Sequence, residues 1–238
     1  MFENYLMKRQ LERDSGIKGI YQIYVSNKYT KTQAPKLLFF ADWMEEMGFV
    51  CDALVQFVPE NGGLTLTLCE NIPDYRALMQ QTRESGGILV ETRTTYCSKF
   101  PTVNIGSIYI EKTGLQYGDA LCVRYEPGFI RMRKLPNGTD KLVATVLHGK
   151  WLYRMGFVAG TMVKLVPENG AVTCFLQPNG KTDSNSVPVK ILNGYRSKFE
   201  IPPAVLAVAG LGDERIFVAS LADGVIRVQK LDFAALGF

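Results

Sequence analysis

The most constraining feature of this sequence is an internal repeat with a shift of 108 residues. At that shift, "LLFFADWMEEMGFVCDALVQFVPENGG" (37–63) aligns with "TVLHGKWLYRMGFVAGTMVKLVPENGA" (145–171) without a gap. Eleven of the 27 positions are identical, and the turn "VPENG" occurs in both copies. A match of this length indicates a duplication, so the two halves of the chain are expected to share one fold.

A second pair of similar segments lies between and after these copies. Residues 114–135 align with 210–231 at a shift of 96. Upstream of them, "YCSKF" (96–100) aligns with "YRSKF" (195–199) at a shift of 99. The three-residue difference predicts a small deletion in the helix region of the last copy.

The four segments share one order of elements, which predicts four β-α-β-β units in one chain. On this alignment Lys99 is equivalent to Lys198, and Arg131 is equivalent to Arg227. Units one and two are expected to pair, as are units three and four. The other pairing, one with three and two with four, needs crossovers through the middle of the chain and is disfavoured by the rule of short connections.

Local patterns predict the elements inside a unit. Trp43, Met44 and Met47 mark one side of a short helix, and Gly48 suits the left-handed position that ends it. The Pro and the Asn-Gly pair of "VPENG" predict a tight hairpin turn between two strands. The same pattern in the second copy places Trp151, like Trp43, in a core and not in a stack with bases.

The repeat also sets the expected boundaries. Residues 1–17 are a helical extension, 18–135 a first domain and 141–232 a second. The first domain is expected to carry an inserted amphipathic helix over 73–85, which has no counterpart in the second. One face of that helix holds Ile72, Tyr75, Leu78, Met79 and Thr82.

Composition narrows the class of protein. The chain is 47% hydrophobic, which supports folded cores, and its 27 Lys and Arg against 23 Asp and Glu give a net charge of +4. The surplus of basic residues lies after residue 95. A mild positive charge permits a polyanionic partner without requiring one, and any nucleic-acid surface is expected in the later part of the chain.

Cysteine usage and hydropathy bear on location. The five cysteines are odd in number, widely spaced and never in a CxxC pair, which indicates reduced thiols and neither a disulfide framework nor a zinc site. The first residues lack the apolar segment of a signal peptide, and no uninterrupted apolar run approaches 18 residues. We therefore expect a cytoplasmic protein with no membrane association, no metal and no cofactor.

Several of these segments resemble known families. "YQIYVSNKYTKTQAPKLLFFADWMEEMGF" with "VPENGGLTLTL", and "TVLHGKWLYRMGFVAGTMVKLVPENGAV", resemble the SymE family of toxin-like proteins. The last unit, "KFEIPPAVLAVAGLGDERIFVASLADGVIRV", is similar to the AbrB/MazE/SpoVT group of DNA-binding proteins. The resemblance covers most of residues 20–231. It implies a mainly β fold with short helices: two tandem swapped-hairpin barrels, each a pseudo-dimer of two β-α-β-β units.

The resemblance also implies where nucleic acid would bind. In AbrB-like proteins, basic residues of the leading strand and loop contact DNA, and cations on a rigid frame can match phosphates at regular intervals. Each such cation can equally be an ordinary solvated side chain. Tyr96 and Tyr195 are the candidates for stacking on bases. The expected nucleic-acid-binding residues are Lys28, Lys31, Lys36, Arg93, Tyr96, Lys99, Arg131, Arg133, Lys150, Arg154, Tyr195, Arg196, Lys198 and Arg227.

Three functions follow as hypotheses. The first is a non-enzymatic nucleic-acid-binding protein, favouring duplex DNA over RNA, that acts as a regulator or a toxin-like DNA-coating factor. The second is a protein-binding inhibitor or counter-defence scaffold of a mobile element. The third is an RNA endonuclease of the SymE type; the only histidine, His148, aligns with Phe40, which favours a strand position over a repeated catalytic site, so we expect no catalytic residue. Self-association stays open.

Overall fold

The computed structural model describes residues 20–25, 34–40, 43–94, 100–177, 184–193 and 196–238. The proposed extension over 1–17 lies outside these ranges. The described chain forms two compact parts, each of which contains two of the four predicted β-α-β-β segments. From here on, unit 1 means the part with residues 20–135 and 234–238, and unit 2 means the part with residues 136–233. Both are mainly β with short helices, as the sequence predicts. Among the described residues, no helix is long and apolar enough to span a membrane.

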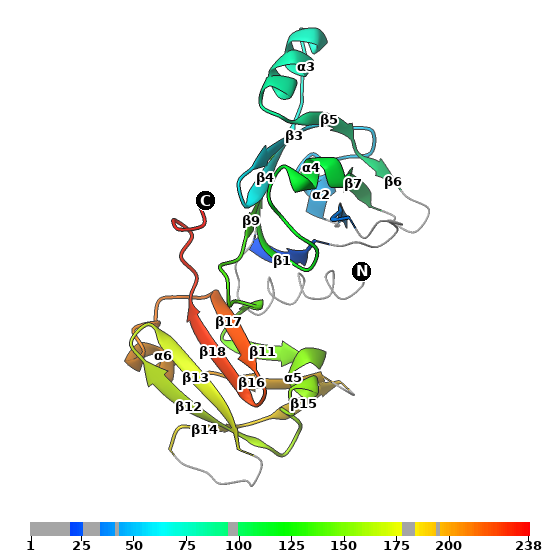
Figure 1. Cartoon of the computed structure of the whole chain (residues 1–238). Coiled ribbons are helices and arrows are strands. Elements are labelled where there is room, and N and C mark those ends of the chain that lie inside the picture. Colours follow the sequence, from blue (N-terminus) through cyan, green and yellow to red (C-terminus); the bar gives the residue numbers. More distant parts are fainter. Residues whose placement is uncertain (1–19, 26–33, 41–42, 95–99, 178–183, 194–195) are drawn as a thin grey trace. The chain divides into compact units, whose positions relative to one another are not determined.

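Unit 1 contains two antiparallel sheets and three short helices among its described residues (Figure 1). Its elements are β1 (Ile20–Tyr24), β2 (Leu37–Phe40), α2 (Trp43–Glu46), β3 (Leu54–Glu60), β4 (Gly63–Leu68), α3 (Tyr75–Glu84), β5 (Ile88–Glu91), β6 (Arg93–Thr94), β7 (Pro101–Ile105), α4 (Ser107–Glu111), β8 (Ala120–Glu126) and β9 (Phe129–Lys134).

Unit 2 repeats this series of elements without a counterpart of α3 in its described part. Its elements are β10 (Lys141–Val143), β11 (Val146–Gly149), α5 (Lys150–Arg154), β12 (Met162–Glu168), β13 (Ala171–Gln177), β14 (Ser186–Pro188), β15 (Lys190–Asn193), β16 (Arg196–Glu200), α6 (Pro203–Val208), β17 (Phe217–Ala222) and β18 (Val225–Lys230).

The strand order is the same in both units. The larger sheet runs β1-β8-β9-β4-β3-β5 in unit 1 and β10-β17-β18-β13-β12-β14 in unit 2. The smaller sheet runs β2-β7-β6 and β11-β16-β15, respectively. Each order corresponds strand for strand when the elements are matched along the chain. The duplication seen in the sequence is therefore a duplication of topology.

The sheets are open, which corrects the expectation of closed barrels. Each larger sheet ends on two different edge strands, β1 and β5 in unit 1 and β10 and β14 in unit 2. Neither edge pairs with the other among the described residues, and the strands of the smaller sheet pair only with one another. A barrel requires the first and last strands to hydrogen-bond. Each unit is instead two sheets that share one core.

Strand register corrects one equivalence within the repeat. His148 on β11 lies opposite Lys198 on β16, and the repeat partner of His148, Phe40, lies opposite Thr102 on β7. Thr102, and not Lys99, therefore occupies the place of Lys198. Strand β7 thus aligns with β16 at a shift of 96 residues, the same shift that relates residues 114–135 to 210–231. Cross-strand pairing fixes register because one face of the strand is buried. The similarity of "YCSKF" and "YRSKF" does not reflect equivalent positions.

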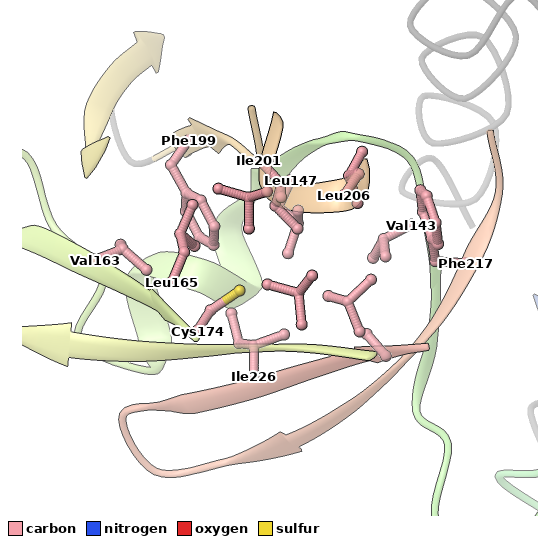
Figure 2. Close-up of a cluster of buried hydrophobic side chains, with 14 of the residues drawn as sticks. Val143, Leu147, Val163, Leu165, Cys174, Phe199, Ile201, Leu206, Phe217 and Ile226 are labelled. Atoms are coloured by element: carbon pink, nitrogen blue, oxygen red, sulfur yellow. The ribbon is translucent and has the colours of Figure 1, made fainter. Parts of the chain in front are cut away.

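Each unit has its own hydrophobic core. In unit 2 the buried cluster draws side chains from both sheets and from α5 and α6, and Figure 2 shows Leu147, Phe199, Leu206 and Ile226 pointing toward one another. Phe157 is fully buried there, and its ring stacks on Phe199 with centroids 5.7 Å apart. Burial of such apolar surface is the main favourable term in folding.

The two helices that carry tryptophan pack as predicted. Trp43 is buried in the core of unit 1 and stacks on Tyr125 with ring centroids 3.8 Å apart. Trp151 packs against the core of unit 2, and its Nε1 donates to the main-chain oxygen of His148 at 2.9 Å. Gly48 ends its helix with φ +87°, the left-handed conformation expected from the sequence.

Helix α3 lies inside the range predicted for the inserted helix. The Asp74 side chain caps it by accepting hydrogen bonds from the main-chain N–H groups of Arg76 and Ala77. The predicted apolar face is only partly covered, since Thr82 is buried whereas Tyr75 is 52% exposed. The helix packs mainly on β5 and β3, beyond the edge of the larger sheet (Figure 1).

The second glycine of "VPENGG" predicts a sharp difference between the two repeats. A Cβ on Gly63 would lie 2.3 Å from the main-chain oxygen of Met132 on the neighbouring strand, so the backbone would have to move. We expect Gly63→Ala to lower the free energy of unfolding by about 1–3 kcal/mol. The equivalent Ala171 is already buried, and Ala171→Gly should cost only about 0.5–1 kcal/mol. Urea denaturation measures both; equal effects would contradict the close approach at Gly63.

Candidate nucleic-acid interface

The smaller sheet of unit 2 presents a row of cations on its outer side. Along β16 the side chains of Ser197 and Phe199 are buried, and those of Arg196 and Lys198 lie on the opposite face. This alternation follows from the period of two in a strand. Both cations are partly exposed.

Cross-strand partners extend this row on both sides. Lys198 lies directly opposite His148 of β11 and Lys190 of β15, so all three side chains project from one face. Lys190 is exposed. Glu200, two residues beyond Lys198 on the same face, forms no ion pair with it. The centre of the sheet therefore places like charges side by side.

Helix α5 adds two more cations beside the sheet. It follows β11 directly and packs against β16 (Figure 1). Leu152 enters the core, while Lys150 and Arg154, one helical turn apart, are exposed. Tyr153 between them is 45% exposed. We call Lys150, Arg154, Lys190, Arg196 and Lys198 the basic face; none of the five forms an ion pair with another described residue.

The pairing of Lys190 with Lys198 is expected to cost stability. Like charges directly opposite each other in an antiparallel sheet are destabilising, by up to about 1 kcal/mol. Replacing Lys198 with the residue found at its place in unit 1, Lys198→Thr, should therefore raise the free energy of unfolding by about 0.2–1 kcal/mol. Thermal unfolding at low salt measures this. A lower melting temperature would show that Lys198 serves the fold.

Two arginines of the larger sheet in unit 1 have an internal partner. Arg131 Nη2 lies 2.9 Å from Glu60 Oε2, and Arg133 forms a second ion pair with the same oxygen. Ile130 and Met132, which alternate with these arginines along β9, are fully buried, so the two guanidinium groups share the outer face. Glu60 is the glutamate of the first "VPENG" turn and joins its hairpin to β9.

The second "VPENG" turn repeats this arrangement. Glu168 forms an ion pair with Arg227, and it accepts a hydrogen bond from Thr173 Oγ1 at 2.9 Å. Thr173 is the partner of Arg227 across β13 and β18. Both copies of the turn therefore use their glutamate to tie two hairpins together.

These contacts shift the carboxyl pKa values. Burial by itself would raise the pKa of Glu60, but hydrogen bonds from Arg131 and Arg133 and their charges outweigh burial and lower it below 4.5. The hydrogen bond from Arg227, followed by that from Thr173, lowers the pKa of Glu168. Both carboxylates are thus held in the charged form that the arginines require.

Removing the carboxylate of Glu60 should destabilise unit 1 in a pH-dependent way. Glu60→Gln leaves two partly buried arginines without their counter-charge, and we expect a loss of about 1–3 kcal/mol at pH 7. Because the folded pKa of Glu60 is lowered, its contribution is fully present above the ordinary value of 4.5 and is lost as the pH falls through the folded value. Denaturation at pH 7 and at successively lower pH should show the difference from wild type shrinking below pH 4.5. A difference that grows in acid would contradict the ion pair.

The predicted binding residues thus fall into four groups. Lys150, Arg154, Arg196 and Lys198 are members of the basic face, and Lys36 of unit 1 is partly exposed next to β2. Four others are ion-paired, Arg93 with Glu91 at 3.5 Å and Arg131, Arg133 and Arg227 as described above. The remaining predicted residues, Lys28, Lys31, Tyr96, Lys99 and Tyr195, lie outside the described residues.

Sequence reasoning missed one member of the face. Lys190 is not among the predicted residues, because it lies upstream of the aligned motif "YRSKF" (195–199). The alternation of Val189, Lys190 and Ile191 was the available signal, since it predicts an extended segment with Lys190 on the side away from the buried Val189.

Two of the described cysteines, Cys122 and Cys174, lie in the cores as free thiols. Cys122 and Cys174 are fully buried, and burial raises the pKa of each thiol to about 12, so neither is a thiolate at neutral pH. Within the described ranges, no group of three or more His, Cys, Asp or Glu side chains is placed to hold a metal ion.

Comparisons with known proteins give little. No protein-family model matches the chain, and no curated protein matches it. Weak matches occur to solved bacterial sliding clamps. The DNA polymerase III β subunit from Pseudomonas aeruginosa is 11% identical over 84% of this chain and 66% of that one, with a TM-score of 0.12. The clamp from Bartonella birtlesii is 14% identical over 83% and 63%, with the same TM-score. The chain thus spans less than two thirds of either clamp, and scores this low carry no argument about fold or function.

Proposed function

We propose that this chain is a nucleic-acid-binding protein that holds duplex DNA on the basic face, without catalysis, and acts as a regulator or DNA-coating factor. The observation that carries the proposal is the set of five cations on β15, β16 and α5 that have no acidic partner among the described residues. Elsewhere, Glu60 and Glu168 neutralise their neighbouring arginines. Cations left unpaired at a cost in stability are typical of a surface that an anion completes.

The strand order supports the proposed kinship with swapped-hairpin proteins. In unit 1 the hairpin β3–β4 lies beside the hairpin β8–β9. The order β1-β8-β9-β4-β3-β5 is symmetric: exchanging the two β-α-β-β segments, so that β3 and β4 change places with β8 and β9 and β1 with β5, gives the same order read from the other end. Strands of one unit also pair with strands of the other, β1 with β8 and β2 with β7. We propose that each half of the chain is a SymE/AbrB-like pseudo-dimer whose sheets remain open.

Salt dependence tests the proposed function. Binding that neutralises four or five phosphates should lose affinity with a slope of log K against log salt of about −4, which is more than about 100-fold between 50 and 200 mM salt. Fluorescence anisotropy with a labelled duplex measures this, and single-stranded DNA and RNA of the same sequence serve as competitors. Undetectable duplex binding at low salt, or a slope near zero, would overturn the proposal. Tighter binding to a single strand would replace duplex DNA as the ligand.

A specific observation keeps RNA cleavage as a second candidate. His148, the only histidine, lies opposite Lys198 on the basic face. Metal-free RNA cleavage needs one group that removes the proton from the 2′-hydroxyl and a second that protonates the leaving 5′-oxygen, and His148 with the ammonium group of Lys198 opposite it offers such a pair. Labelled RNA incubated in chelator with wild type and His148→Ala tests it. Absence of cleavage, or cleavage that persists in His148→Ala, would remove this candidate.

A protein partner is the remaining alternative. Pull-down of one stoichiometric protein that resists nuclease treatment would favour an inhibitor or scaffold over a nucleic-acid binder. Release of all bound material by nuclease would count against it. Self-association is separable from both by measuring the mass in solution with nuclease present.

A further inference from the structure

The duplicated fold supplies a built-in comparison for the basic face. Because the two units share strand order, the paired residues of the smaller sheet in unit 2 have definite counterparts in unit 1. If the fold alone demanded cations at these places, unit 1 would carry them as well. We therefore compare the charged residues at equivalent positions of the two smaller sheets and of the helices beside them.

The smaller sheet of unit 1 lacks the central cations. Thr102 stands at the place of Lys198 and is buried, being 3% exposed. One strand position earlier on this face, Phe100 stands at the place of Arg196. The outer strand keeps its cation, since Arg93 pairs with Thr102 as Lys190 pairs with Lys198.

The one cation that is kept in the sheet has a counter-charge. Arg93 Nη2 lies 3.5 Å from Glu91 Oε2, and both side chains are exposed. Pro188 occupies the place of Glu91 in unit 2, because Glu91 lies opposite Leu54 and Pro188 opposite its repeat partner Met162. A proline has no charge to offer Lys190. The same strand position is thus neutralised in unit 1 and left cationic in unit 2.

The helix beside the sheet reverses its charge. Glu45 and Glu46 of α2 are the repeat partners of Tyr153 and Arg154 of α5, and both glutamates are exposed. The buried sides of the two helices stay alike, with Trp43 and Trp151 at equivalent positions. The core of the helix is therefore retained while its solvent side changes from basic to acidic.

We infer that nucleic acid is bound by unit 2 alone, so that each chain has one binding site and not two. The inference rests on the proposed function and narrows it. At the compared positions unit 1 has the carboxylates Glu45, Glu46 and Glu91 and a single cation. Unit 2 has four of the five cations of the basic face there, and one carboxylate, Glu200, where unit 1 has Asn104.

The physical basis is the sign of the local field. Phosphates are attracted to a surface of unpaired cations and repelled by a surface with excess carboxylates, and both effects are strongest at low salt. A duplex is therefore attracted to α5 and β16 of unit 2. A duplex placed in the same way on unit 1 is repelled by the glutamates of α2. Duplication followed by charge reversal in one copy leaves a single site on a doubled scaffold.

The equivalent cations Lys190 and Arg93 provide a matched test. Both are exposed on the outer strand of a smaller sheet, so Lys190→Glu and Arg93→Glu make the same change of charge at the same place in the fold. We expect Lys190→Glu to lower duplex affinity roughly tenfold at low salt, the loss of about one phosphate contact, and Arg93→Glu to change it less than about twofold. Anisotropy titration measures the affinities, and thermal unfolding checks that both variants fold.

Stoichiometry gives a second readout on the same protein. Native mass spectrometry with a short duplex in excess should show one duplex per wild-type chain. Glu45→Tyr combined with Glu46→Arg, which transfers the α5 residues to α2, should add weak binding of a second duplex. The two experiments separate the proposed function from the assignment of the site to unit 2.

No duplex binding by wild type at low salt would overturn the proposed function. If wild type binds duplex, the assignment to unit 2 alone is overturned by any of three results: equal losses of affinity in Lys190→Glu and Arg93→Glu, a loss only in Arg93→Glu, or a loss in neither.

Discussion

Replacing Lys190, Arg196 and Lys198 together with glutamate is expected to lower the affinity for duplex DNA at least about 100-fold at low salt. Each reversal removes about one phosphate contact and adds a repelling charge in its place. The salt slope should flatten by about one for each contact that is lost. Anisotropy titrations over a range of salt concentrations measure both quantities.

The matched control for this variant changes the same amount of charge elsewhere. Arg76, Arg83 and Arg124 are exposed cations of unit 1 that form no ion pair with a described residue. Their replacement with glutamate gives the same net charge, so it reproduces any long-range effect of the overall field. Affinity should fall by much less than in the basic-face variant. Equal losses in the two variants would mean that net charge, and not the basic face, governs binding.

Phe157→Ala is expected to lower the free energy of unfolding of unit 2 by about 3–5 kcal/mol. Phe157 is fully buried, and truncation of such a ring removes its burial energy and leaves a cavity in the core. The ring also stacks on Phe199, the residue next to Lys198 on β16. Loss of this support should weaken duplex binding as well, because β16 carries the centre of the basic face.

Phe49→Ala is the matched variant for the other core. Phe49 is the repeat partner of Phe157 and is likewise fully buried, but it belongs to the cluster of unit 1. We expect a similar loss of stability in unit 1, with duplex affinity unchanged under conditions where unit 1 stays folded. Hydrogen exchange resolved along the chain measures which unit loses protection. A loss of duplex affinity in Phe49→Ala equal to that in Phe157→Ala would contradict the separate roles of the two cores.

The sequence predicted the repeated architecture well because the signals were local. A tryptophan on a short helix, a glycine after it, alternation along a strand and an Asn-Gly turn each depend on a few adjacent residues. The match over 27 positions then carried the same elements into the second half. The inserted helix is predicted by a local pattern of its own, the apolar face over 73–85.

Features that depend on pairing between distant strands were not predicted. The glutamate of "VPENG" looked like a turn residue, but Glu60 binds Arg131, which is 71 positions away. The repetition of both the glutamate and the arginine in the two halves was the available signal. Closure of the sheets into barrels was expected from family resemblance, and the pairing of edge strands that it requires has no local signature.

The candidate site was predicted in part for the same reason. The surplus of basic residues after residue 95 predicts a binding surface in the later half of the chain, which is also where the proposed basic face lies, and the last repeat contributes Arg196 and Lys198 to it. Which cations are neutralised could not be read from sequence, because Arg131 and Arg227 look as available as Lys198 until their partners are placed. The similar motifs around Lys99 and Lys198 also suggested an equivalence that strand register does not support.

Lysine footprinting tests the central claim most directly, because it reports which amino groups the duplex covers. The protein is modified with an amine-reactive acylating reagent with and without saturating duplex at low salt, and the change at each lysine is measured by mass spectrometry. We predict strong protection of Lys150, Lys190 and Lys198, and unchanged reactivity of Lys112, an exposed lysine of unit 1. Unchanged reactivity of the three lysines of the basic face at saturation, or protection confined to unit 1, would contradict the account.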